Sequence, residues 1–423
     1  MAKCAQPKLA PLPPANRPSR TGAPQPTMHA PSPSLAVLVA ITAINPLAMN
    51  IVQPALPEMA RALATNYGTV QLALALYLVA SAVSQIALGP ISDRFGRRPV
   101  ALAGVGIFIV GSLACIAATS IWALVLGRIV QAAGGIAGFA MARAALRDMH
   151  GLDATAARLG DVMVPVIVVP MIAPLIGGWI AENGGYVGVF AFTALFGAAV
   201  LVFAFLLLHE THHADRRSAQ AFSARAFATL IASPAFLAQV ATLSFSSAIF
   251  FSFLAGAPYV VIELQREGPS IFGAWYMLAS IGYMAGNFLS SRFAVRIGVR
   301  RVLGFGMLAT CIGVALVAAA YGAFPGSTAA LFIAAMPIWI GNGLTMPSVT
   351  ANALSVRPDL AGTASGLLGA AQLGVGAVSA QITAVVLSTT GWPMVTVMAV
   401  SAVLAMCGYM LAGRHPVIER DMR

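Results

Sequence analysis

The sequence predicts an all-α integral membrane protein with two pseudo-symmetric six-helix bundles around a central cavity. Composition, the spacing of apolar segments and the placement of basic residues support this fold class. Of the 423 residues, 59% are hydrophobic and only 9% are charged, whereas a soluble domain carries roughly 25% charged residues. The composition excludes a soluble enzyme, a nucleic-acid-binding protein and a disordered chain, and it indicates a helical protein that crosses the bilayer many times.

Residues 1–34 differ from the rest of the chain. They hold nine prolines, four basic residues and no acid. A signal peptide requires a contiguous apolar core, and this segment has none. We therefore expect a disordered, proline-rich basic tail in the cytoplasm.

Twelve apolar runs of about 20 residues, the length that crosses the hydrocarbon core, follow this tail. They lie near 35–57, 69–89, 99–119, 121–143, 161–182, 186–208, 235–258, 270–291, 301–321, 328–350, 362–388 and 391–413. The most polar interior stretch follows the sixth run. The expected organisation is a six-helix bundle over 35–208, a cytoplasmic linker over 209–234, a second bundle over 235–413 and a cytoplasmic tail over 414–423.

The basic residues orient these runs. With the N-terminus in the cytoplasm, 21 of the 24 lysines and arginines fall in cytoplasmic segments, Arg61 and Arg266 lie outside, and Arg128 lies within the fourth run. This asymmetry follows the positive-inside rule and places both ends of the chain in the cytoplasm. The net charge of +11 is explained in the same way, so no nucleic-acid partner is expected.

The two halves repeat each other. The segment Asp93–Arg98 follows the second run, and the similar segment Arg296–Arg301 follows the second run of the other half. Two six-helix halves in parallel orientation indicate a transporter whose site lies between them near the membrane midplane.

One loop motif suggests a conformational gate. Gly89 allows close helix contact, and Asp93 begins a short turn in which its carboxylate accepts from backbone N–H groups and pairs with arginine. Such a cluster latches helix ends in one state and releases them in another. The residues of this motif are Gly89, Asp93, Arg94, Gly96, Arg97 and Arg98.

This loop resembles that of the major facilitator superfamily, and further positions are similar to its bicyclomycin and chloramphenicol resistance branch of drug:proton antiporters. Those positions are Gln71, Tyr77, Gln85, Pro54–Pro57 and Ser252–Tyr259. The resemblance covers nearly the whole chain from about residue 35. It implies a twelve-helix transporter that exports a small amphipathic compound against inward proton flow.

The fifth run carries a proline and glycine pattern that is similar to the antiporter motif of this family. It comprises Pro170, Pro174, Gly177 and Gly178. Proline removes a backbone donor and bends a helix, and paired glycines let a neighbouring helix approach closely. The segment suits a hinge that seals the outer side, and a generic kinked helix is the alternative.

Arg128 is the only charged residue well inside a run, and Arg128 with Gln131 is similar to the family pattern in the fourth helix. An arginine at this depth costs a few kcal/mol, so it faces protein or water. Asn50 lies at the same depth, where the resembled branch commonly has an aspartate. We expect Asn50 to accept a hydrogen bond from Arg128 and to leave the cavity net positive, which favours neutral or anionic substrates. A structural arginine satisfied by carbonyls is the alternative.

Other polar and aromatic residues within the runs are candidates for the cavity wall. The substrate and coupling site is assigned to Asn50, Gln53, Tyr77, Gln85, Arg128 and Gln131. Further candidates are Asn45, Ser81, Gln239, Asn287, Asn342, Gln372, Phe245, Phe250, Phe251 and Trp339. In the eleventh run, Gly362, Gly366, Gly369, Gly374 and Gly376 predict close helix packing.

One segment matches a zinc-protease signature. His209, Glu210 and His213 fit H-E-x-x-H, in which two histidines and a glutamate share a helix face. An intramembrane metalloprotease is therefore the alternative from another functional class, but it needs a third ligand that no run centre supplies. We expect no metal and no cofactor.

Together these features predict a monomeric efflux transporter, not an enzyme, in the bacterial inner membrane. Its partners are the lipid bilayer, a small-molecule substrate and, by the resemblance, protons. A facilitator or an uptake symporter for a small metabolite is the second transporter hypothesis.

Overall fold

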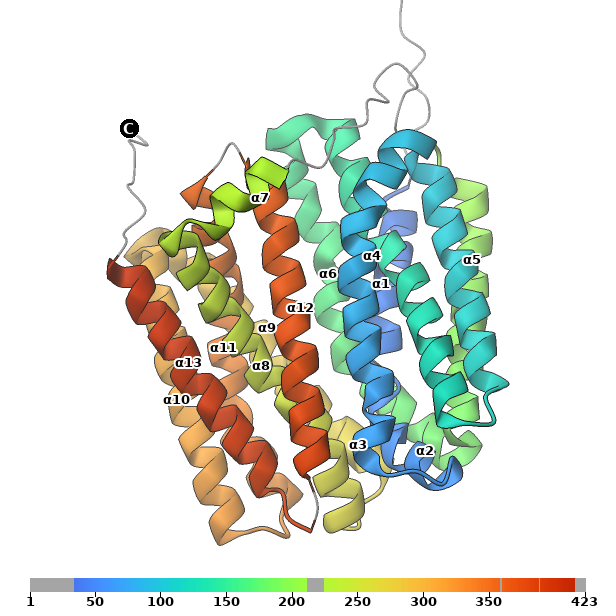
Figure 1. The fold of residues 1–423 in the computed structure, drawn as a ribbon, viewed down its shortest axis with the longest axis vertical. Coiled ribbons are helices and arrows are strands. Elements are labelled where there is room, and N and C mark those ends of the chain that lie inside the picture. Colours follow the sequence, from blue (N-terminus) through green and yellow to red (C-terminus); the bar gives the residue numbers. More distant parts are fainter. Residues whose placement is uncertain (1–33, 211–223, 358–359, 388, 415–423) are drawn as a thin grey trace, which may run out of the picture.

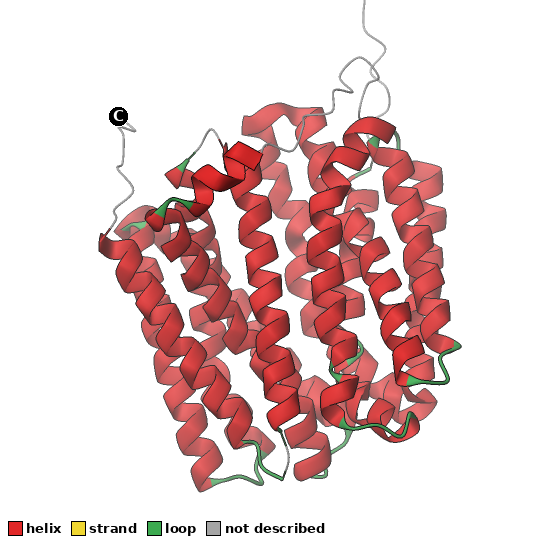
Figure 2. Ribbon diagram, in the orientation of Figure 1, coloured by secondary structure: helices red, strands yellow, loops and turns green. Residues whose placement is uncertain are grey.

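The computed structural model describes residues 34–210, 224–357, 360–387 and 389–414, and within these residues it contains helices and short connections but no strand (Figure 2). The first half comprises α1 (Leu35–Asn50), η1 (Gln53–Ala55), α2 (Leu56–Ala62), α3 (Tyr67–Val70), α4 (Leu72–Phe95), α5 (Arg97–Ile116) and α6 (Ile121–Leu207). The second comprises α7 (Ala224–Ile231), α8 (Pro234–Pro258), η3 (Tyr259–Leu264), α9 (Pro269–Ile297), α10 (Val299–Ala323), α11 (Thr328–Val356), α12 (Ala361–Val386) and α13 (Trp392–Arg414).

Helix α6 folds back on itself and crosses the bundle more than once. The side-chain nitrogen of Gln131 lies 3.4 Å from the Thr193 hydroxyl, although 62 residues separate them and a straight helix would place them about 90 Å apart. Gly185 has a φ of +63°, a conformation that favours glycine, and it breaks the helix between the predicted fifth and sixth spans.

The membrane-length helices agree with the predicted twelve spans. Within the described residues, ten segments are long and apolar enough to cross a bilayer. One of them, Val168–Leu207, contains two predicted spans on either side of Gly185. Helix α9, with 29 residues, covers another predicted span but is not among these ten, because its glycine, serine, tyrosine and asparagine residues make it less apolar than the others.

Polar side chains begin several of these helices at the predicted loops. The side chains of Asn66, Ser120, Ser233 and Ser327 accept a hydrogen bond from the backbone N–H three residues later, at the starts of α3, α6, α8 and α11. Such caps satisfy donors that have no partner within the helix. Short loops therefore suffice to reverse the chain direction between spans.

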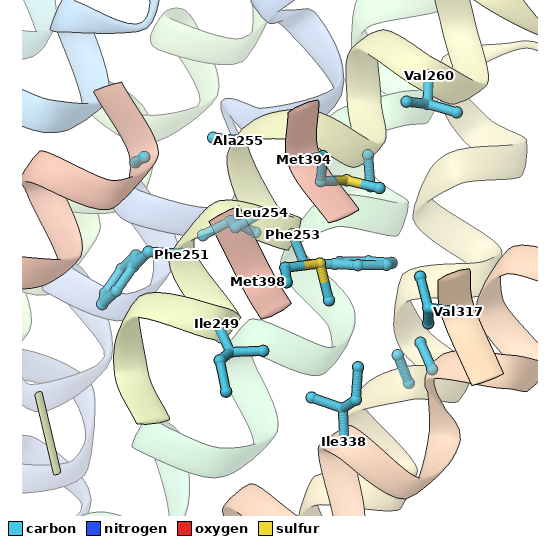
Figure 3. Close-up of a cluster of buried hydrophobic side chains, with 14 of the residues drawn as sticks. Ile249, Phe251, Phe253, Leu254, Ala255, Val260, Val317, Ile338, Met394 and Met398 are labelled. Carbon is cyan, nitrogen blue, oxygen red and sulfur yellow. The ribbon is translucent and has the colours of Figure 1, made fainter. Parts of the chain in front are cut away.

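Two helix bundles stand side by side in Figure 1, and they meet along α4 with α12 and along α6 with α9. One apolar cluster lies within the first bundle, and another lies mainly in the second bundle but also includes Leu74, Ala75 and Leu78 of α4. In the second bundle, Met394 and Met398 of α13 pack against Phe253 and Leu254 of α8 (Figure 3). Large apolar side chains such as Leu195 are exposed on the outer surface, as a lipid-facing surface requires.

Candidate functional site

A cavity of about 380 Å³ lies between the two bundles. Helices α1, α4 and α6 of the first half and α8, α9, α11 and α12 of the second supply its wall. The polar lining residues are Asn45, Asn50, Gln85, Ser247, Ser280, Asn342, Thr350, Ser365 and Gln372. The aromatic lining residues are Phe139, Phe250, Phe251, Tyr276, Tyr283 and Trp339. A few polar groups within a mainly apolar wall are typical of small-molecule sites.

Trp339 of α11 organises the aromatic wall. Its ring meets Phe250 and Phe253 of α8 edge to face, each with 5.4 Å between ring centroids, and it lies 5.8 Å from Tyr276 of α9. Edge-to-face pairs hold large rings in fixed positions. These contacts therefore fix the aromatic rings that the second half contributes to the cavity wall, beside its polar lining residues.

The structure separates the predicted cavity residues into two groups. Asn50 and Gln85 line the cavity, as do the further candidates Asn45, Asn342, Gln372, Phe250, Phe251 and Trp339. By contrast, Gln53, Tyr77, Arg128 and Gln131 are buried within the first bundle and do not line it. The sequence also missed two lining tyrosines of α9, Tyr276 and Tyr283, which no motif marks.

Arg128 is bound inside the first bundle. Its Nε donates to the carbonyl of Ala73 on α4 at 3.3 Å, and one Nη donates to the carbonyl of Ala48 on α1 at 3.2 Å and to Gln131 Oε1 at 2.5 Å. Its guanidinium carbon lies 4.0 Å from the centroid of the Tyr77 ring, a cation–π contact. Backbone carbonyls, an amide and an aromatic face thus satisfy this arginine.

Gln131 extends the same network to two more passes of the chain. Its Nε2 donates to the Ser112 hydroxyl of α5 at 2.8 Å and to the Thr193 hydroxyl of the last pass of α6 at 3.4 Å. Gly111 lets the Gln131 backbone approach α5, because an added Cβ there would overlap it. The Arg128–Gln131 network therefore ties together α1, α4, α5 and two passes of α6.

The prediction of a hydrogen bond between Asn50 and Arg128 is wrong. Asn50 Nδ2 donates to the carbonyl of Pro46 at 2.8 Å, and Asn50 Oδ1 has no hydrogen-bond partner within the described part of the chain. Arg128 nevertheless contacts α1 close to Asn50, since it binds the carbonyl of Ala48, two residues before Asn50. Its donors meet the carbonyls of Ala48 on α1 and Ala73 on α4 in place of the Asn50 side chain.

The expected positive charge of the cavity wall needs the same correction. None of the described residues that line the cavity is charged. The guanidinium of Arg128 lies behind the wall, in contact with Tyr77. The cavity wall is consequently neutral, polar and aromatic.

The predicted gate motif joins α4 to α5. Asp93 lies in the last turn of α4 instead of beginning a turn, and its carboxylate pairs with Arg97 at 2.6 Å. Arg97 also donates to the Ser92 hydroxyl. Gly96 connects the two helices with a φ of +98°, which favours glycine. We call this edge of the molecule the Asp93 end.

Glu210 caps the start of α5, a contact that the sequence did not predict. Its carboxylate accepts the backbone N–H groups of Arg97 at 2.9 Å and Arg98 at 3.2 Å, where the helix dipole favours a negative charge. The zinc-protease hypothesis assigned Glu210 to catalysis, but the carboxylate has this structural role. His213 lies outside the described residues.

The proline and glycine segment of α6 packs against both halves. An added Cβ at Gly177 would overlap the carbonyl of Ile51, which follows α1, and one at Gly178 would overlap the carbonyl of Pro269, which begins α9. Gly273 of α9 approaches the carbonyl of Pro174 in the same way. Pro170 lines the cavity. This segment therefore seals α6 against α9 beyond the cavity.

Polar contacts join the halves at the opposite end from Asp93, which we call the Tyr67 end. The Tyr67 hydroxyl donates to the carbonyl of Ala255 at 2.7 Å, and Gln381 Nε2 donates to the carbonyl of Gly68 at 2.9 Å. Gly68 is packed tightly, because an added Cβ would lie 3.2 Å from the Val385 backbone. Helices α3 and α12 are thus held together here.

Two carboxylates reinforce the Tyr67 end. Glu182 accepts the backbone N–H and the hydroxyl of Ser270, at 3.0 and 2.7 Å. Arg61 lies 3.6 Å from Glu263. The lining residue Ser365 lies near the Asp93 end of α12, whereas Tyr276 lies in the half of α9 nearer the Tyr67 end, so the cavity lies between the two ends.

Comparisons with known proteins identify the family. The family profile described as "Major Facilitator Superfamily" matches residues 38–379. The chain belongs to the major facilitator superfamily. It is therefore a multi-pass membrane transporter, and the fold inferred from the two bundles is confirmed.

Relatives support the resemblance to the resistance branch. The chain is 30% identical to "Chloramphenicol resistance protein" of Pseudomonas aeruginosa, over 88% of this chain and 90% of that protein. It is 27% identical to "Bicyclomycin resistance protein homolog" of Haemophilus influenzae, over 87% and 93%.

A solved structure agrees at the level of the fold. A bacterial homologue of the human lysosomal transporter Spinster, in an inward-facing and unoccupied conformation, matches with a TM-score of 0.70 and 16% identity. The match covers 90% of this chain and 96% of the homologue.

Replacing Arg128 tests its role in the first bundle. Arg128→Lys keeps the charge but cannot reach both carbonyls, so buried acceptors lose partners at a cost of about 1–3 kcal/mol each. We expect the thermal unfolding temperature of the purified transporter to fall by several degrees. The control Arg292→Lys changes an exposed arginine of α9. Equal unfolding temperatures for both variants would contradict this role.

Proposed function

We propose that this transporter exports small, uncharged amphipathic compounds from the cytoplasm by alternating access, coupled to inward proton flow. The neutral, aromatic cavity between the two halves is the observation that carries this proposal. The names of the relatives, which refer to bicyclomycin and chloramphenicol resistance, support drug-like substrates.

Orientation completes the proposal. From the basic residues we infer that both termini lie on the cytoplasmic side of the bacterial inner membrane, so that the Asp93 end faces the cytoplasm and the Tyr67 end faces outward. The contacts at the Tyr67 end then close the outer side, and the structure corresponds to an inward-facing state. The Pro170–Gly178 segment serves as the outer seal, and the Asp93 motif as the inner gate.

Proton coupling requires an acid outside the cavity wall. Since the described lining residues include no carboxylate, a proton cannot bind beside the substrate within this wall. The available acids lie at span ends, where Asp93 pairs with Arg97 and Glu182 binds Ser270 across the halves. We assign the coupling proton to such an acid.

The substrate charge is tested with Asn50. In everted vesicles with an imposed proton gradient, we expect wild type to transport chloramphenicol and to transport the cationic dye ethidium poorly. Asn50→Asp introduces a carboxylate into the wall, so ethidium transport relative to chloramphenicol should rise several-fold.

Two outcomes would contradict the proposal. A wild-type preference for ethidium would overturn the uncharged substrate class. Chloramphenicol transport that does not depend on the proton gradient would indicate a facilitator. Movement of chloramphenicol out of the vesicles together with protons from the lumen would indicate an uptake symporter.

Helices α4 and α12 define the movement that closes the inner side. At the Tyr67 end Gly68 contacts Val385, and farther along an added Cβ at Gly369 would lie 3.9 Å from Gln85. The predicted tight packing of the glycines holds at Gly376, which lies against Phe251, and fails at Gly362, Gly366 and Gly374, where added Cβ atoms meet nothing within 4 Å. The antiparallel register places Leu88 opposite Gly366 when the helices close.

Filling this open space should stop transport without unfolding the protein. Gly366→Leu has room in the inward-facing state but blocks the approach of α4, so we expect chloramphenicol binding to persist and export in vesicles to be lost. The matched control is Gly106→Leu on α5, where an added Cβ also meets open space. Wild-type export by Gly366→Leu would rule out closure along this face.

A further inference from the structure

The amide of Asn45 is held in one orientation on the cavity wall. The Tyr77 hydroxyl donates to Asn45 Oδ1 at 2.8 Å, and Asn45 lines the cavity whereas Tyr77 is fully buried. An amide has one oxygen, which accepts, and one nitrogen, which donates. Because Tyr77 occupies the oxygen, Asn45 offers its nitrogen as a donor to a ligand.

Tyr77 itself is fixed from behind. Its ring lies under the Arg128 guanidinium at 4.0 Å, and Arg128 is bound to two helices. Gly135 of α6 closes the other side, since an added Cβ there would lie 3.4 Å from the Tyr77 hydroxyl and 3.6 Å from Asn45 Oδ1. The Tyr77–Asn45 pair is therefore enclosed except toward the cavity.

Asn50, farther along α1, has the opposite arrangement to Asn45: its side-chain nitrogen is bonded within the helix and its oxygen is not. Its Nδ2 donates to the carbonyl of Pro46 at 2.8 Å, and its buried Oδ1 has no partner among the described residues. A buried acceptor without a hydrogen bond is costly, so a ligand donor would relieve it. The α1 wall thus presents a donor at Asn45 and an acceptor at Asn50.

The facing wall of α11 also carries unpaired polar groups. Trp339 Nε1 and both side-chain polar atoms of Asn342 have no partner within the described part of the chain, and these residues are only 2% and 1% exposed. They lie three residues apart, on one helix face. A ligand that spans the cavity would therefore meet hydrogen-bonding groups from both halves.

The geometry points to Tyr77 as a positioning residue. By holding the Asn45 amide in one orientation, it makes the cavity distinguish ligands by where they carry hydrogen-bond donors and acceptors. The ligand class that fits is an uncharged aromatic molecule that offers an acceptor to Asn45 and a donor to Asn50. This inference rests on the proposed function, because it assigns the polarity of the same cavity. Tyr77 acts only through Asn45.

Two uncharged fluorescent dyes test this assignment by binding to the purified protein. 7-Amino-4-methylcoumarin and 7-dimethylamino-4-methylcoumarin share rings and a carbonyl acceptor, but only the first has N–H donors. Wild type should bind the amino dye more tightly. Tyr77→Phe keeps the ring under Arg128 and lets Asn45 turn its oxygen to the cavity, so the affinity ratio should rise about threefold to tenfold toward the amino dye.

A double-mutant cycle separates positioning from a structural effect. In an Asn45→Ala background, Tyr77→Phe should leave the dye ratio unchanged, and the control Tyr409→Phe should leave it unchanged in wild type. The inference would be overturned if Tyr77→Phe did not alter the affinity ratio, or if it altered the ratio equally in the Asn45→Ala background. Failure of both dyes to bind wild type would also overturn it. Thermal unfolding checks that each variant is folded.

The same measurements distinguish this inference from the proposed function. Dye binding to purified protein needs neither transport nor a proton gradient. If wild-type vesicles do not export chloramphenicol but the purified protein gives the expected dye ratios, the export proposal is contradicted and this inference is not.

Discussion

The buried charge of Arg128 organises the first half of this transporter. Arg128 lies within a membrane-length helix of a chain with few charged residues. A guanidinium without partners is unfavourable at such a position. The cost is offset by carbonyls of α1 and α4, by Gln131 and by the face of Tyr77. Because these partners come from separate helices, satisfying one charge also fixes how the helices pack.

This use of Arg128 explains the character of the cavity. The charge is satisfied inside the bundle, and the described lining residues of the first half are three amides, Phe139 and apolar side chains, with no ion among them. Selectivity must then come from shape and hydrogen-bond polarity, and Tyr77 links the buried arginine to that polarity through Asn45. The proton coupling proposed above would then use acids outside the described wall, such as those that join helix ends.

The fold could be predicted largely from the sequence, because hydropathy reports directly on membrane-length helices. The site could be predicted only in part. Asn50 and Gln85 face the cavity, but Arg128 and Gln131 do not, since their partners are mostly backbone carbonyls and hydroxyls that leave no sequence signature. Likewise, nothing near Glu210 indicates that it caps a helix more than a hundred residues earlier. Which face of a helix lines a cavity depends on its rotation and packing, as Tyr276 and Tyr283 of α9 illustrate.

The central claim is that Arg128 belongs to the scaffold and not to the cavity surface. Labelling the transporter in membranes with phenylglyoxal, which modifies accessible arginines, followed by peptide mass spectrometry, tests it most directly. The exposed arginines Arg292 and Arg300 should be modified while Arg128 remains unmodified, with and without chloramphenicol. Rapid modification of Arg128 that chloramphenicol prevents would place this arginine in the binding surface and contradict the account.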